Sequence, residues 1–430
     1  MNRKDFSVEV ITEAKKRDLI PNIPLSECTP IPAIHKVEWD LTFHCNDHCM
    51  HCVTDSGPEC NIFTKTSDAI KIMDNIQKYN IIRRIKNLYV EKVEFEFRSS
   101  PILEKLEKKK KPPIHLDDRL SESYLECLHG TNYYTILKTR NDKMKLNFGR
   151  PHIRLSGGEF FTWPKNKFKV EDERLKEQSK FLKKLRQTMP EYDIWILTNG
   201  RFAVSDEKSD EVIGYWSENL GLEDKTTGKT RICISTDLFH SPPQGSTIEQ
   251  MLKRMWNSCF KHGLSAPFLY GIHGREIYYA GRAFDKMNVG KLKNFNNVSR
   301  SDFNPQKNYT VTTKDLIETD GCNELKGFFV EIRDKGFIPV NNININPEGH
   351  LMFCCAQVGD YGDFINYPEI ALKNIIRNPI AFMMRKKETV IPFLNLVAEM
   401  DPTIKVYGSG KHPAVVSSTC YQMLSEKRKD

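Results

Sequence analysis

Several features that the sequence lacks narrow the class of protein. No apolar run approaches the roughly 20 residues that a helix needs to cross a bilayer. The start, MNRKDFSVEVITEAKKRD, has no apolar block of the signal-peptide kind, and no internal repeat is present. With 39% hydrophobic and 28% charged residues over 430 positions, the composition is that of a globular protein. We therefore expect a cytoplasmic chain without a membrane partner.

The sequence also has little excess of either charge. Lys and Arg total 64 against 56 Asp and Glu, a net charge of +8, and part of the excess lies in a lysine-rich run at 104–111. No aromatic residues interleave with this run, which is typical of a solvated face. The sequence thus does not favour a nucleic-acid partner. An RNA-modifying enzyme would require RNA binding that depends steeply on salt.

Cysteines, in contrast, are numerous. There are 12 of them, and a reducing cytoplasm does not sustain structural disulfides, so metal or redox chemistry is the better interpretation. Three of them, Cys45, Cys49 and Cys52, lie in FHCNDHCMHC. Three thiolates within eight residues of a loop can point at one centre. Spacing alone leaves a zinc site open, because the neighbouring histidines could complete a tetrahedral shell.

The hydrophobic pattern predicts strands and helices in alternation. Val37, Trp39 and Leu41 alternate with polar residues, which is the period of a strand. The expected strands lie at 36–44, 152–156, 192–198, 231–236 and 267–272, and the expected helices at 66–82, 172–188, 207–220, 247–262, 367–386 and 389–400. This order predicts βα units and therefore a parallel sheet in an α/β fold.

Two stretches depart from this rhythm. Residues 84–148 are predicted to form an insertion or lid, because only a short loop would be expected there. From 281 to 430 the elements shorten at first and become rich in asparagine, which predicts a separate C-terminal module. The remaining parts are an N-terminal extension over 1–35 and a main domain over 36–280.

Short polar segments follow three of the predicted strands: Ser156-Gly157-Gly158-Glu159, Thr198-Asn199-Gly200 and Ser235-Thr236-Asp237. Parallel sheets place their active sites at the carboxyl ends of the strands, so we expect these segments beside the cysteine loop. The glycines allow a ligand to approach the backbone closely. Glu159 and Asp237 can accept hydrogen bonds from an amino group and from hydroxyls.

In this order, the motifs resemble those of the radical SAM superfamily. The chain has the CxxxCxxC loop, with His51 at the position that an aromatic residue usually holds, followed by GGE at 157–159, ILTNG at 196–200 and ISTD at 234–237. The resemblance covers roughly residues 35 to 280. It implies a partial (β/α)6 barrel and a [4Fe-4S] cluster on Cys45, Cys49 and Cys52, with the remaining iron binding S-adenosylmethionine (SAM).

The resemblance also implies contacts to the cofactor and a reaction. The GGE segment, Gly157, Gly158 and Glu159, would contact the methionyl amino group, and Ser235 and Asp237 the ribose. The other two positions assigned to cofactor binding are His51 and Asn199. Reductive cleavage of SAM would give a 5′-deoxyadenosyl radical that abstracts hydrogen from the substrate, with a flavodoxin or ferredoxin as electron donor. No catalytic side chain is predicted.

The C-terminal module resembles the SPASM and twitch extensions of that superfamily, which are smaller α+β modules. Gly349 precedes Cys354 with the spacing of their hairpin. The candidate ligands for one auxiliary iron–sulfur cluster are Cys322, Cys354, Cys355 and Cys420. Cys322 lies farther upstream than is usual, and the later cysteines of a full SPASM domain are absent. An auxiliary cluster and a vestigial fold without one both stay open.

The predicted substrate is a ribosomally synthesised peptide, because such extensions are common among peptide-modifying members of the superfamily. The alternative is a small-molecule natural-product intermediate, such as a sugar, an amino acid or a nucleoside. A third interpretation is a non-catalytic metal-binding scaffold. The intact GGE and ISTD segments speak against it, since a scaffold has no use for contacts to SAM.

Overall fold

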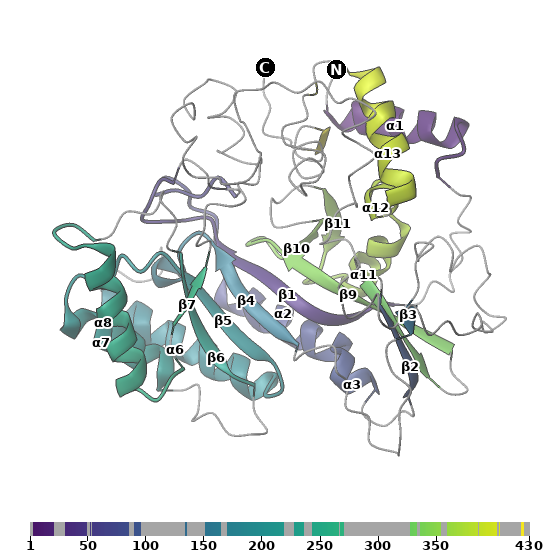
Figure 1. The fold of residues 1–430 in the computed structure, drawn as a ribbon. Helices are drawn as coiled ribbons and strands as arrows, with labels where there is room; N and C mark the ends of the chain where they lie inside the picture. Colours follow the sequence, from purple (N-terminus) through teal and green to yellow (C-terminus); the bar gives the residue numbers. More distant parts are fainter. Residues whose placement is uncertain are drawn as a thin grey trace.

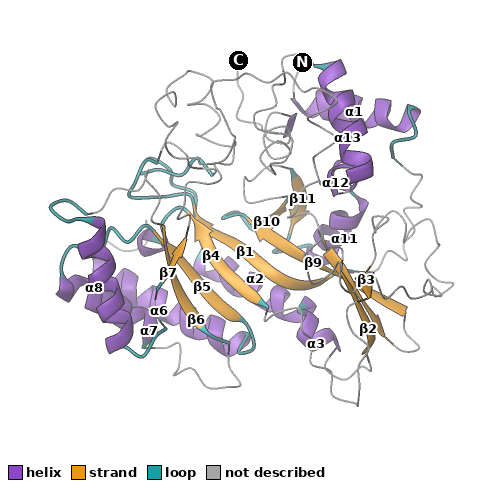
Figure 2. Cartoon of the chain, viewed as in Figure 1, coloured by secondary structure: helices purple, strands orange, loops and turns teal. Residues whose placement is uncertain are grey.

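The computed structural model is an α/β fold built on one open sheet (Figures 1 and 2). It describes residues 3–20, 31–49, 52, 54–85, 90–95, 134–135, 151–164, 170–218, 228–235, 243–265, 267–270, 327–332, 336–353, 359–385, 387–401, 404 and 423–424. The α/β class predicted from the sequence is confirmed.

The described strands form a sheet of 11 strands in the order β3-β2-β8-β9-β1-β4-β5-β6-β7, and β10 and β11 branch from β9. The bounds are β1 Ala33–Thr42, β2 Val90–Phe95, β3 Tyr134–Thr135, β4 His152–Gly157, β5 Asp193–Thr198, β6 Thr230–Ser235, β7 Phe268–Tyr270, β8 Gly327–Ile332, β9 Gly336–Ile345, β10 His350–Met352 and β11 Asp360–Asp363. All neighbours from β9 through β1 to β7 run parallel, whereas β8, β2 and β3 are joined by antiparallel pairings. The predicted parallel sheet is therefore present, with an antiparallel extension beyond β9.

Helices follow the parallel strands as the sequence predicts. The bounds are α1 Arg3–Lys16, α2 Thr66–Tyr79, α3 Ile81–Ile85, the 3-10 turn η1 Phe160–Thr162, α6 Glu171–Thr188, α7 Asp206–Ser217, α8 Ile248–Lys261, α11 Pro368–Arg377, α12 Pro379–Arg385 and α13 Lys387–Met400. Thr247 and Gln250 form a capping box at the start of α8, and Ser205 caps α7. No helix in the described ranges combines the length and apolar character that a membrane crossing requires.

The core lies between the parallel strands and these helices. The side chains of Val37, Trp39 and Leu41 are fully buried, and the ring of Trp39 packs edge-on against Phe181 of α6 at 5.6 Å between centroids. The alternation along β1 thus turns every second residue toward the helices, as expected for a strand with two different faces. The packing fixes the strands on which the functional segments end.

The C-terminal segment joins the same sheet. Strand β9 pairs in parallel with β1, and a turn at Gly349, whose φ is +83°, leads back into β10. The predicted helix over 367–386 is divided into α11 and α12 at Asn378. Pro379 explains the break, because proline lacks an N–H group and disfavours the helical conformation in the residue before it.

Part of the predicted insertion also belongs to the sheet. Strands β2 and β3 lie within 84–148, and β2 pairs with β8 of the C-terminal segment. The described part of the insertion therefore extends the sheet, and a covering role for the rest stays a prediction.

Candidate functional site

The three clustered cysteines lie in one folded loop at the carboxyl end of β1. The N–H of Cys45 donates to the carbonyl of Gly57 over 3.1 Å, and the N–H of Gly57 donates to the carbonyl of Phe43 over 3.2 Å. Within the loop, the N–H of Cys52 donates to the carbonyl of Cys49 over 3.2 Å. Backbone hydrogen bonds thus close the segment that carries all three thiols.

Two of the thiols have polar neighbours. The sulfur of Cys52 accepts a hydrogen bond from the N–H of Ser56 at 3.2 Å and lies 3.4 Å from the hydroxyl of Thr54. The sulfur of Cys45 accepts one from Nδ2 of Asn199 at 3.8 Å. Donors of this kind stabilise thiolates and tune the potential of iron–sulfur clusters.

The charge around Cys45 suits a bound cation. Burial and the nearby carboxylate of Glu159 raise the pKa of the Cys45 thiol well above its ordinary value. A metal reverses this effect, because a thiol that coordinates a metal ion loses its proton. A partly buried thiol beside a buried carboxylate therefore fits a positively charged iron centre.

The end of β4 is pressed against the cysteine loop. The N–H of Gly158 donates to the carbonyl of Thr42 over 2.5 Å, and the N–H of Glu159 donates to that of His44 over 2.9 Å. A Cβ atom on Gly158 would lie 2.0 Å from the carbonyl oxygen of His44, and one on Gly157 would lie 2.5 Å from that of Thr42. Gly157 also has a φ of +103°, which side chains rarely adopt. Both glycines of the GGE segment are thus required for this close approach.

Glu159 connects β4 to β5. Its side chain is 1% exposed. One carboxylate oxygen accepts hydrogen bonds from the hydroxyl of Thr198 at 2.8 Å and the N–H of Phe161 at 3.0 Å, and the other accepts one from the N–H of Asn199 at 2.7 Å. In this arrangement the carboxylate positions the end of β5. Its contact with a cofactor amino group stays a prediction.

Asn199 and Arg201 hold the cysteine loop from the side of β5. Nδ2 of Asn199 donates to Oδ1 of Asn46 over 2.7 Å as well as to Cys45. A guanidinium nitrogen of Arg201 donates to the carbonyl of Asn46 and lies 3.2 Å from the carboxylate of Asp47. Sequence reasoning missed Arg201, Asn46 and Asp47. The only available signal was that Arg201 directly follows the ILTNG segment.

The remaining predicted residues fall into two groups. Ser235 ends β6, and its strand runs parallel to β5, so its position is at the same sheet edge. The others lie outside the described residues: His51, Asp237, Cys322, Cys354, Cys355 and Cys420. The structure therefore brings together the cysteine loop, the GGE segment and Asn199, with Ser235 along the same edge.

No group of three or more His, Cys, Asp or Glu side chains in the described part of the chain is placed to hold a metal ion. A single ion requires its ligands to meet at one point. The thiolates of a multi-iron cluster each bind a separate iron atom, so they stand farther apart. A cluster on Cys45, Cys49 and Cys52 therefore stays a prediction.

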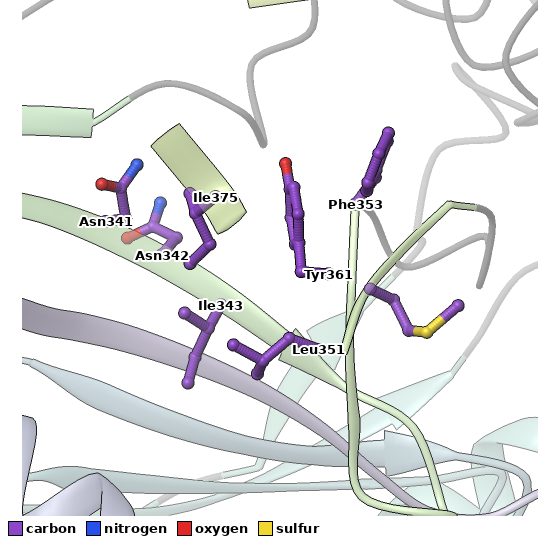
Figure 3. A pocket seen from close by; sticks show the side chains of 8 residues that line it. Asn341, Asn342, Ile343, Leu351, Phe353, Tyr361 and Ile375 are labelled. Atoms are coloured by element: carbon purple, nitrogen blue, oxygen red, sulfur yellow. The ribbon is translucent and has the colours of Figure 1, made fainter. Parts of the chain in front are cut away.

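A separate hollow lies in the C-terminal segment, between β9, β10, β11 and α11 (Figure 3). Asn341, Phe353, Tyr361 and Ile375 are among the residues that line it, and the rings of Phe353 and Tyr361 stack at 4.4 Å. Asn341 pairs with Ile34 in the first half of β1. None of the residues that line the hollow belongs to the cysteine loop or to the GGE segment.

Comparisons with known proteins give distant similarities in structure alone. No protein-family model matches the sequence, and no curated protein matches it significantly. The structure of BtrN in complex with AdoMet and 2-DOIA is similar with a TM-score of 0.35 and 9% identity, over 83% of this chain and 88% of that chain. That of Streptococcus suis SuiB bound to S-adenosylmethionine has a TM-score of 0.27 and 8% identity, over 80% of this chain and 63% of that chain. Both TM-scores are below 0.5, so we transfer neither family nor ligand from these structures to this chain.

Proposed function

We propose that this protein is a radical SAM enzyme whose [4Fe-4S] cluster is held by Cys45, Cys49 and Cys52. The observation that carries the proposal is the direct packing of Gly158 and Glu159 against the closed cysteine loop, through hydrogen bonds of 2.5 and 2.9 Å to the carbonyls of Thr42 and His44. Two motifs more than a hundred residues apart thereby meet at the carboxyl edge of a parallel sheet, where such folds place their active sites.

Different residues at this edge have different proposed roles. The cluster would supply the electron that cleaves SAM to a 5′-deoxyadenosyl radical. Gly157 and Gly158 are proposed to contact the methionyl group, and Ser235 and Asp237 are proposed to bind the ribose. Asn199 holds the loop through Asn46 and donates to the sulfur of Cys45. The chain thus binds and orients the cofactor beside the substrate.

The proposed substrate is a ribosomally synthesised peptide. The support is the hairpin of β9 and β10, whose turn is at Gly349 and which ends just before Cys354, in agreement with a SPASM- or twitch-like extension. One auxiliary cluster on Cys322, Cys354, Cys355 and Cys420 belongs to the same proposal, as does a flavodoxin or ferredoxin that donates the electron.

Metal analysis after anaerobic reconstitution tests this function. The wild type should contain iron and sulfide, and with dithionite it should convert SAM to 5′-deoxyadenosine. In a variant with Cys45, Cys49 and Cys52 all changed to Ala, this cleavage should vanish, and about four irons retained would establish the auxiliary cluster. Loss of all iron would leave one catalytic cluster and favour a small-molecule substrate. Zinc in place of iron in the wild type would overturn the proposal.

A further inference from the structure

The two faces of the parallel strands differ sharply in chemistry. Five residues in register across the sheet form an apolar row on the helix-covered face, and each is at most 1% exposed: Ile345, Trp39, Leu155, Ile196 and Ile232. Figure 1 shows α2, α6, α7 and α8 along this side of the strands. This face is the hydrophobic core and holds no ligand.

One residue earlier on each strand, the opposite face carries a different set. Five residues are again in register across β9, β1, β4, β5 and β6, and we call them the polar row: Asn344, Glu38, Arg154, Trp195 and Arg231. Successive residues of a strand point to opposite faces, so these side chains leave the sheet on the side away from the helices. An amide, a carboxylate, two guanidiniums and an indole therefore lie side by side in mid-sheet.

The two arginines of the polar row differ in their ion pairing. Glu38 and Arg154 form an ion pair with each other. Nε of Arg231 is buried and has no hydrogen-bond partner among the described residues. Burial raises the pKa of Cys233 to about 11, and the charges of the Arg154 and Arg231 guanidiniums oppose this rise. Arginine keeps its proton in proteins, so Arg231 carries a positive charge, and Glu38, the one carboxylate of the row, is paired with Arg154.

The position of the polar row suits a ligand that reaches toward the cysteine loop. Arg154 precedes Gly157 by three residues, and a strand rises about 3.3 Å per residue, so the row is about 10 Å from the proposed SAM site. Trp195 is fixed by stacking on His152, with 4.7 Å between ring centroids and 11° between planes. The rigid indole offers an apolar surface for the carbon atoms of a ligand. The guanidiniums on either side of it offer positive charge for a polar end group.

We infer that the polar row is the floor of the substrate pocket and that Arg231 binds an oxyanion of the substrate, either a carboxylate or a phosphate, with Trp195 under the adjoining carbon atoms. This inference rests on the proposed function for the identity of the reaction, but the binding of an anion does not require SAM chemistry. A guanidinium binds both oxyanions through parallel hydrogen bonds, so the two share one recognition chemistry.

Binding of two probes to the reconstituted holoenzyme tests the inference. Inorganic phosphate and glutarate are titrated separately at constant ionic strength, and tryptophan fluorescence reports binding. At least one probe should change the signal, and Trp195→Phe should remove most of that change. Arg231→Gln should weaken binding about tenfold or more. Arg231→Lys should weaken it less, because lysine keeps the positive charge but lacks the paired N–H donors of the guanidinium. Lys253→Gln, on the exposed side of α8, removes the same charge elsewhere and should bind as the wild type does.

The outcomes distinguish a carboxylate from a phosphate ligand. They also distinguish failure of this inference from failure of the proposed function. Tighter binding of phosphate indicates a phosphorylated substrate, and tighter binding of glutarate indicates a carboxylate. Wild-type affinity in Arg231→Gln, or no binding of either probe to the wild type, would overturn the inference. If Arg231→Gln does not fold, the anion-dependent rise in melting temperature of the wild type and of Arg231→Lys gives the comparison. Iron content and SAM cleavage, measured on the same preparations, show whether the proposed function fails separately.

Discussion

At the carboxyl ends of β1 and β4, backbone hydrogen bonds and two glycines bring the cysteine loop and the GGE segment together, whereas in the middle of the same strands side chains supply the functional groups. The cysteine loop is closed by N–H and carbonyl groups, and Gly158 contacts it without a side chain. The polar row depends on Glu38, Arg154 and Arg231. A site built from backbone fits one fixed group, such as a cofactor, and a site built from side chains can change its ligand by substitution. We therefore expect substitutions of the two glycines at the edge to abolish function and substitutions in the row to change specificity.

Gly158→Ala should have the largest effect. The new Cβ atom would lie 2.0 Å from the carbonyl oxygen of His44, so β4 and the cysteine loop must separate. We expect a loss of about 3 kcal/mol in the free energy of unfolding and little iron after reconstitution, measured by urea titration and metal analysis. Gly245→Ala is the control for backbone strain without a clash, because Gly245 has a φ of +77° and nothing lies within 4 Å of its Cβ position, and it should keep the iron content of the wild type. Wild-type iron content in Gly158→Ala would break the comparison.

His152→Phe tests the mid-sheet region through the pH dependence of the free energy of unfolding. Burial and the charge of Lys36 lower the pKa of His152 to about 4. Between pH 6.5 and 4 the unfolded chain therefore binds a proton that the folded chain does not, so the native state loses up to about 3 kcal/mol as the pH falls through this range. The substitution should remove that part of the pH dependence of unfolding. His350→Gln, at an exposed ion pair with Asp360, should retain it.

Glu159→Gln tests the link between β4 and β5 at nearly constant shape. The amide offers one acceptor oxygen in place of two, so one of the donors on Thr198, Phe161 or Asn199 loses its partner. We expect a loss of about 2 kcal/mol in the free energy of unfolding, measured by urea titration. Glu348→Gln, an exposed carboxylate near the Gly349 turn, should stay within about 0.5 kcal/mol of the wild type. An equal effect of both substitutions would show that Glu159 is not a positioning residue.

Asn199→Ala should have the smallest effect and the most specific one. It removes the donor to the sulfur of Cys45 while leaving the carboxylate of Glu159 in place. Fewer hydrogen bonds to a cluster sulfur lower the reduction potential, so we expect a more negative midpoint in a redox titration followed by electron paramagnetic resonance. Asn75→Ala, whose amide bonds only the carbonyls of Phe364 and Ile365, is the control. An unchanged midpoint would remove Asn199 from the cluster environment.

Much of the parallel half of the sheet could be predicted because its signals are local. The alternation around Trp39 identified β1, and the polar segments identified the ends of β4, β5 and β6. The two glycines at 157–158 could be recognised in the sequence, but the structural reason for them could not. The reason for these glycines is contact with carbonyl oxygens of Thr42 and His44, which are more than a hundred positions away.

The rest could not be predicted because its causes are pairings between distant segments. Nothing in the sequence around Asn342 indicates a parallel pairing with Lys36. The bond from Asn199 to Cys45 and the ion pair between Arg201 and Asp47 likewise depend on the sheet order. The break at Pro379 was the exception, since its signal is local and was overlooked within an otherwise helical pattern.

The parallel pairing of β9 with β1 also bears on how the chain is made. Strand β1 ends at Thr42 and β9 begins at Gly336, roughly 300 residues later, which a ribosome adds in about 15 to 60 s at ordinary rates of about 5 to 20 residues per second. During that time β1 has a bare edge of N–H and carbonyl groups, of the kind that pairs with foreign strands. A chain shortened before β9 would keep this edge permanently, and we expect it to aggregate even with its cysteine loop intact.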